Sequence, residues 1–97
     1  TRLRIAFSDG TVIQERNAAE TFVAFVRRVG VERVRSLGLK QCKIPLVSNT
    51  IDKKYGDKQK PLGNGWYLMT NTSTQSKLKD IEYIARAFNI KVKVDII

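Results

Sequence analysis

The sequence predicts an α+β fold: a two-layer sandwich in which a mainly antiparallel sheet of about five strands carries helices on one face. Segments near both ends of the chain alternate apolar and polar residues, as half-buried strands do. Between them lie amphipathic stretches at helical spacing, each preceded by capping residues. Strands with one apolar face need helices to cover that face, so the expected order of elements is ββααββαβ.

The first predicted element is a β-hairpin, because residues 3–7 alternate apolar and polar side chains before an Asp-Gly turn. A two-residue turn would direct Ile13 away from the apolar face of the first strand. A three-residue turn ending at Gly10 pairs Ile13 with Ile5 instead and needs glycine in a left-handed conformation. We favour the longer turn because it keeps the apolar side chains of both strands together.

Two helices are expected next. Asn17 followed by Glu20 predicts a helix start with reciprocal capping, and Gly30 can end that helix. A shorter amphipathic helix should cover residues 31–37. The pair has the outline of a helix-turn-helix, but its second helix is too short and too apolar for a recognition helix. Both helices contribute to one basic cluster, made of Arg27, Arg28, Arg33 and Arg35.

The second half of the chain should hold three more strands and one helix. Residues 44–47 predict a third strand, placed at a sheet edge because Pro45 cannot donate a ladder hydrogen bond. Residues 49–65 are rich in Lys, Gly, Asp and Asn and are predicted to form a long loop. A fourth strand is expected at residues 66–70, a helix opened by a Thr72–Gln75 capping box, and a fifth strand at residues 92–96.

The chain of 97 residues is expected to form one domain over residues 1–97. It begins at Thr1 and not at methionine, so a domain cut from a longer chain is an open alternative. Its uncharged stretches are too short for a membrane span, and no signal peptide is expected. One cysteine, Cys42, allows no internal disulfide, which fits a reducing compartment and a cytoplasmic location.

Catalysis is not expected. The sequence has no histidine, which removes the commonest general base near neutral pH and the commonest metal ligand. Its nine carboxylates are scattered along the chain. We therefore expect no enzymatic activity, no metal and no cofactor.

The charge balance points to an anionic partner. Eighteen Lys and Arg face nine Asp and Glu, which gives a formal net charge of +9. A small body with this charge attracts polyanions, of which nucleic acid is the commonest, and we expect DNA before RNA. The alternative is a protein-interaction or assembly module that recognises an acidic partner or pairs through an exposed strand edge.

Three groups of residues are candidates for nucleic-acid binding. If the first and last strands lie side by side, their outward cations form a strip of Arg2, Arg4, Lys91 and Lys93, on which Trp66 or Tyr67 could stack a base. At the start of the last helix, backbone N–H groups with Thr72, Ser73 and Lys77 could hold a phosphate. Lysines of residues 49–65 could clamp a phosphate backbone beside aromatic rings. The alternative without a ligand is that Thr72 and Ser73 only cap the helix and that the cations of the strip only keep the sheet face hydrated.

Several motifs resemble those of small uncharacterised bacterial domains. These are Phe-Ser-Asp-Gly-Thr-Val-Ile at residues 7–13, Pro-Leu-Val-Ser at 45–48 and Gly-Trp-Tyr-Leu at 65–68. Such domains are loosely associated with restriction–modification and other DNA-handling proteins, often as appendages of a larger chain. The resemblance implies an accessory role near DNA and assigns no site residue.

Overall fold

The computed structural model describes all 97 residues. The first half of the chain holds β1 (Leu3–Phe7), β2 (Val12–Ile13), α1 (Ala18–Val29), α2 (Val31–Ser36), β3 (Lys40–Gln41), β4 (Ile44–Pro45) and β5 (Val47–Ser48). The second half holds the 3₁₀ helix η1 (Lys53–Lys58), β6 (Gln59–Gly63), β7 (Trp66–Met69), α3 (Thr74–Ala87) and β8 (Val92–Ile96).

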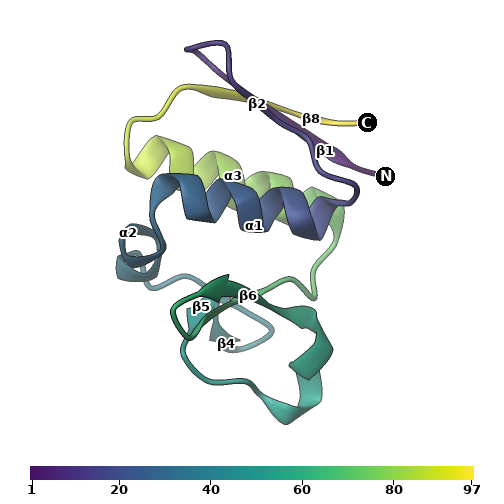
Figure 1. Ribbon diagram of the computed structural model, residues 1–97, viewed down its shortest axis with the longest axis vertical. Helices are drawn as coiled ribbons and strands as arrows, with labels where there is room; N and C mark the ends of the chain where they lie inside the picture. Colours follow the sequence, from purple (N-terminus) through teal and green to yellow (C-terminus); the bar gives the residue numbers. More distant parts are fainter.

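These elements form three layers (Figure 1). The first sheet has the strand order β2-β1-β8, and the second sheet has the order β5-β7-β6. Helices α1 and α3 lie between the two sheets, and β3 and β4 form a separate short hairpin. Every strand pair is antiparallel, so the expected α+β class with antiparallel sheets is confirmed.

The predicted single sheet of about five strands, with helices on one face, is wrong. The strands divide into two three-stranded sheets on opposite sides of the helix layer. The second sheet includes β6, which lies inside the segment predicted as a loop and pairs with one side of β7, while β5 pairs with the other side. The element order also gains the β3–β4 hairpin and η1, so ββααββαβ is too simple.

The hairpin at the start of the chain has the predicted register. Ile5 lies opposite Ile13, and Gly10 adopts a left-handed φ of 91°. The turn is closed by a hydrogen bond of 2.8 Å from the Phe7 N–H to the carbonyl of Thr11. Hydrogen bonds from Thr11, with a further contribution from Arg28, lower the pKa of Asp9 to about 2.

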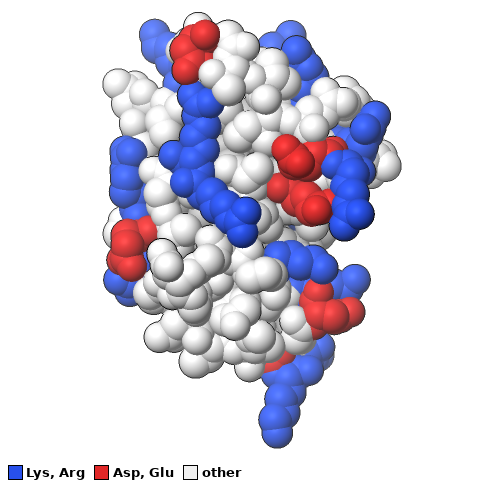
Figure 2. Space-filling view, in the orientation of Figure 1, with Lys and Arg blue, Asp and Glu red and all other residues white.

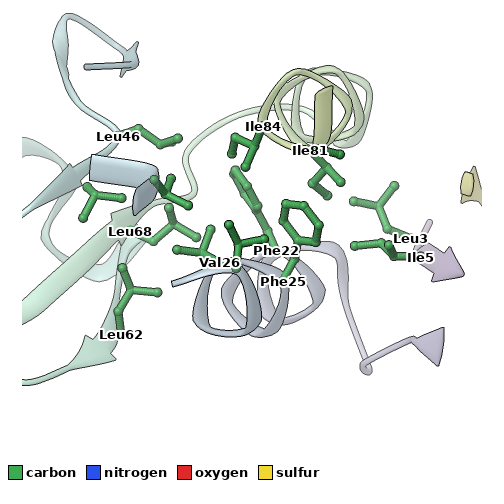
Figure 3. Packing of buried hydrophobic residues seen from close by; sticks show 14 of the residues in the cluster. Leu3, Ile5, Phe22, Phe25, Val26, Leu46, Leu62, Leu68, Ile81 and Ile84 are labelled. Atoms are coloured by element: carbon green, nitrogen blue, oxygen red, sulfur yellow. The ribbon is translucent and has the colours of Figure 1, made fainter. Parts of the chain in front are cut away.

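One hydrophobic core joins the three layers (Figure 3). Fully buried residues of the first sheet, Leu3 and Ile5, face Phe25 and Ile81 of the helix layer. On the other side of the helices, Leu46, Leu62 and Leu68 of the second sheet region complete the cluster. The helices therefore bury apolar side chains toward both sheets. In a two-layer fold, the apolar side chains on one side of the helices would be exposed.

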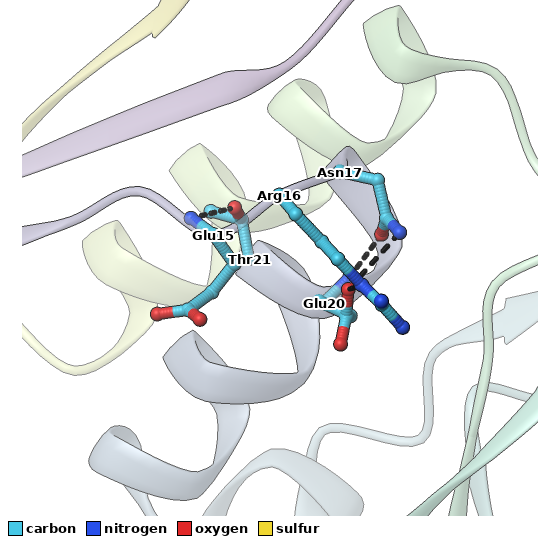
Figure 4. Close-up of polar contacts among 5 residues, drawn as sticks. All are labelled: Glu15, Arg16, Asn17, Glu20 and Thr21. Carbon is cyan, nitrogen blue, oxygen red and sulfur yellow. Dashed lines mark hydrogen bonds and ion pairs between the residues drawn. The ribbon is translucent and has the colours of Figure 1, made fainter.

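The start of α1 confirms the predicted cap (Figure 4). Asn17 Oδ1 accepts a hydrogen bond of 2.9 Å from the Glu20 N–H, and Asn17 Nδ2 donates one of 3.1 Å to the Glu20 carboxylate. Arg16 pairs with the same carboxylate. The buried hydroxyl of Thr21 accepts a hydrogen bond of 3.0 Å from the Glu15 N–H, which fixes the chain entering the helix.

Candidate functional site

The first and last strands lie side by side, which brings the predicted outward cations together. Arg4 is opposite Asp95, and Lys93 is opposite Ala6, on the face of the first sheet that points away from the helices. By strand alternation Arg2 and Lys91 share that face. We call Arg2, Arg4, Lys91 and Lys93 the basic strip. Asp95 is the one carboxylate among them, and the molecule's three ion pairs involve none of the four cations.

The two aromatic candidates are not on the basic strip. Trp66 and Tyr67 belong to β7 of the second sheet, on the far side of the helix layer. The guanidinium of Arg35 lies 4.9 Å from the centre of the Trp66 ring. Trp66 also lines a groove of about 340 Å³ beside α2. Neither of these two rings can therefore stack a base against the strip, and that expectation is corrected.

The last helix begins one residue later than predicted. Ser73 is its N-cap, and the Ser73 hydroxyl accepts a hydrogen bond of 3.0 Å from the Ser76 N–H. The Thr72 hydroxyl is buried and has no hydrogen-bond partner. The predicted capping box of Thr72 and Gln75 is therefore wrong, because the Thr72 side chain turns into the protein instead of toward the helix start.

Lys77 does not face solvent as a phosphate ligand would. It is only 5% exposed, and its Nζ donates to the carbonyl of Thr72. Burial lowers the pKa of Lys77; Asp80 acts in the opposite sense and Lys58 in the same sense. Burial also raises the pKa of Asp80, whose carboxylate accepts a hydrogen bond of 2.9 Å from Gln41. Lys77 therefore ties the helix start to the chain before it.

The arginines of the first two helices are occupied by contacts within the molecule. Arg27 donates to the carbonyls of Leu62 and Pro61, which links α1 to β6. The other three combine an aromatic ring with a polar partner: Arg28 with Phe7 and Asp9, Arg33 with Phe88 and the Val29 carbonyl, and Arg35 with Trp66 and Glu32. These cations hold elements together, which the sequence did not indicate.

Figure 2 shows how the charges are spread on one face of the molecule. The cations lie in separate groups over the helix layer and along the outline, and carboxylates accompany several of them. The outer face of the first sheet forms the top border of this view and is seen edge-on. The face drawn in Figure 2 therefore carries no single continuous basic patch.

The segment predicted as a long lysine-rich loop is folded into η1 and β6. Lys53, Lys54 and Lys58 are exposed there, and the Lys54 ammonium lies 5.4 Å from the centre of the Tyr55 ring. Lys60 faces α1 in a groove that also contains Glu20. Lys58 lines the same groove, whereas Lys53 and Lys54 do not, so the structure brings two of these lysines together and does not gather all four into one clamp.

Nowhere do three or more Cys, Asp or Glu side chains come close enough to hold a metal ion. None of the helices combines the length and the apolar character that crossing a membrane requires. Cys42 is a half-buried free thiol in a tight turn.

Comparisons with known proteins add no relative. No family model matches the chain, and no curated protein or solved structure is significantly similar to it. The function of the chain is therefore inferred from the geometry of the basic strip and its surroundings.

Proposed function

We propose that the chain is a non-catalytic nucleic-acid-binding module that acts through phosphate contacts of the basic strip. The supporting observation is the contrast between two sets of cations. The four arginines of α1 and α2 are held by internal partners, whereas the strip cations share one open sheet face and form no ion pair. Cations without internal partners are the ones free to replace counterions on a phosphate backbone.

The chemistry of this face favours the backbone of duplex DNA as the ligand. Proteins that bind single strands stack bases on aromatic rings, and the rings of Trp66 and Tyr67 lie on the other sheet. Contacts from Lys and Arg to phosphates position a protein on the duplex without reading its sequence. We therefore propose weak, sequence-independent binding in a reducing compartment such as the cytoplasm, where the free thiol of Cys42 is stable.

Fluorescence anisotropy with a labelled duplex tests this proposal across a range of salt concentrations. Each lost phosphate contact should reduce the slope of log K against log salt by about 0.9. If all four strip cations bind phosphates, the wild-type affinity falls roughly 100-fold between 50 and 200 mM salt from these contacts alone. A variant with Arg2, Arg4, Lys91 and Lys93 changed to Gln should lose most of this salt dependence.

A matched control removes the same charge from the opposite end of the molecule. Lys40→Gln, Lys43→Asn, Lys53→Gln and Lys54→Gln together leave the basic strip intact. The control should keep the wild-type slope. Equal losses in both variants would refute the strip, because the attraction would then follow net charge. Failure to bind duplex at low salt, together with binding to polyglutamate, would instead favour an acidic partner protein.

A further inference from the structure

The last strand leaves one edge of the first sheet open. β8 pairs with β1 on one side and with no strand on the other. Arg2 and Ile97 exchange two backbone hydrogen bonds of 2.8 Å, so positions 93, 95 and 97 direct their backbone groups toward β1. The N–H and C=O groups of Val92, Val94 and Ile96 therefore point away from β1, in the plane of the sheet, and pair with no other strand.

This edge lacks the proline, the bulge and the short length that limit strand pairing at the other outer strands, although it carries the charged residues Lys93 and Asp95. The outer strand β6 of the second sheet contains Pro61 and an irregular register next to it. The outer strands β2 and β5 are only two residues long. By contrast, β8 runs for five residues in continuous register, with no proline and no bulge.

Apolar surface is exposed along the same edge. Leu3 and Ile5 on the central strand are fully buried. Their neighbours on β8 face the same way, yet Val94 is only half-buried and Ile96 is 39% exposed. A further strand beside β8 would cover these side chains.

We propose that β8 pairs antiparallel with β8 of a second copy of this chain, about a twofold axis at Val94. In this register Lys93 of each copy lies opposite Asp95 of the other on the outer face. Val92 of each copy lies opposite Ile96 of the other on the apolar face. The outward backbone groups of Val92, Val94 and Ile96 then become the hydrogen-bonded pairs of the new ladder. The two first sheets join into one of order β2-β1-β8-β8-β1-β2.

Charge selects this register among the alternatives. Moving the axis by one residue to position 93 puts the two copies of Lys93 opposite each other, and moving it to position 95 does the same for Asp95. Like charges directly opposite are destabilising. Offsets that pair even with odd positions place Val94 opposite a charged residue and disrupt the apolar face. The sequence Val-Lys-Val-Asp-Ile is thus complementary to a second, antiparallel copy of itself, because lysine then lies opposite aspartate and apolar residues lie opposite apolar residues.

Sedimentation velocity over a concentration series up to about 1 mM tests this pairing, with salt at about 0.15 M to screen the net charge. The wild type should pass from a species of 11.0 kDa to one of twice that mass. Lys93→Glu and Asp95→Lys should each be monomeric. An equimolar mixture of the two variants should associate again, because each copy then presents the charges that the other needs.

Two further variants separate pairing from general effects. Val94→Pro removes an N–H that points away from β1, so it should abolish the dimer and leave the fold intact. Lys53→Glu changes the net charge as Lys93→Glu does, at a distant site, and should still dimerise. A wild type that stays monomeric at about 1 mM overturns the proposal. A dimer that survives Val94→Pro overturns it as well, because another surface would then be responsible. The pairing does not depend on nucleic-acid binding.

Discussion

Truncating Ile5 to alanine should destabilise the whole molecule, including the sheet to which Ile5 does not belong. Ile5 is fully buried on the central strand of the first sheet. Ile→Ala at such a site costs about 3–4 kcal/mol, out of the roughly 5–15 kcal/mol expected for a domain of this size. With a urea dependence near 1.5 kcal/mol/M, the midpoint of unfolding should fall by about 2 M.

The single tryptophan makes the test specific. Trp66 lies on the second sheet, so its fluorescence reports unfolding on the far side of the helix layer, while far-UV circular dichroism reports the whole chain. Because one core joins the three layers, both signals should shift together in Ile5→Ala. Val12→Thr, on an exposed residue of the same sheet, should change stability by less than about 0.5 kcal/mol. An unchanged Trp66 transition in Ile5→Ala would refute the single cooperative core.

Three further predictions concern local features. Ser73→Ala should lower the free energy of unfolding, measured in urea, by about 1 kcal/mol, because it removes the N-cap hydrogen bond. Thr72→Val should lower it by less or raise it, because the Thr72 hydroxyl has no hydrogen-bond partner. The opposite ranking would show that Thr72, and not Ser73, caps the helix. Burial lowers the pKa of Lys77, so the unfolded chain holds that proton more tightly, and stability should rise as pH increases toward 10.5. Lys77→Met should weaken this rise and the exposed Lys79→Met should not, as measured by unfolding at pH 7 and pH 10. The lowered pKa of Asp9 stabilises the wild type above pH 3.8, and this stabilisation is lost as the pH falls from 3.8 to about 2. Asp9→Asn should lack this pH-dependent contribution, as acid titration followed by circular dichroism would show.

Local chemistry made several features predictable. The Asn17 cap depends on residues within one turn of each other, and the register of the first hairpin follows from the Gly10 turn and the alternation of apolar residues. The position of Lys77 could also have been read from the sequence. It precedes Ile81 and Ile84 at spacings of four and seven, which places it on the buried stripe of the helix.

The second sheet was harder to predict because β6 looks unlike a strand. It contains Lys60, Pro61 and Gly63, and Leu62 is its one apolar residue. The signal that was missed is the Asn64-Gly65 pair directly before β7. Both residues adopt left-handed conformations there, as a two-residue hairpin turn requires.

The internal partners of the arginines in α1 and α2 could not be predicted from the neighbouring sequence. Arg27 binds carbonyls 34 and 35 residues further along the chain, and such partners exist only once the layers are assembled. Net charge counts every cation equally, although the folded molecule leaves only some of them free. The basic strip therefore differs from the arginines of α1 and α2 in having no internal partners, and this contrast becomes visible only in three dimensions.

The meeting of the two chain ends has a consequence for protein engineering. Arg2 and Ile97 are hydrogen-bonded neighbours, and both termini leave the first sheet at the same border (Figure 1). A short glycine-rich linker from Ile97 to Thr1 would turn β8 and β1 into an ordinary hairpin, and new ends could then be opened at the exposed Asn64-Gly65 turn. For the same reason, the domain can be grafted into a surface loop of a host protein whose two attachment points are close together.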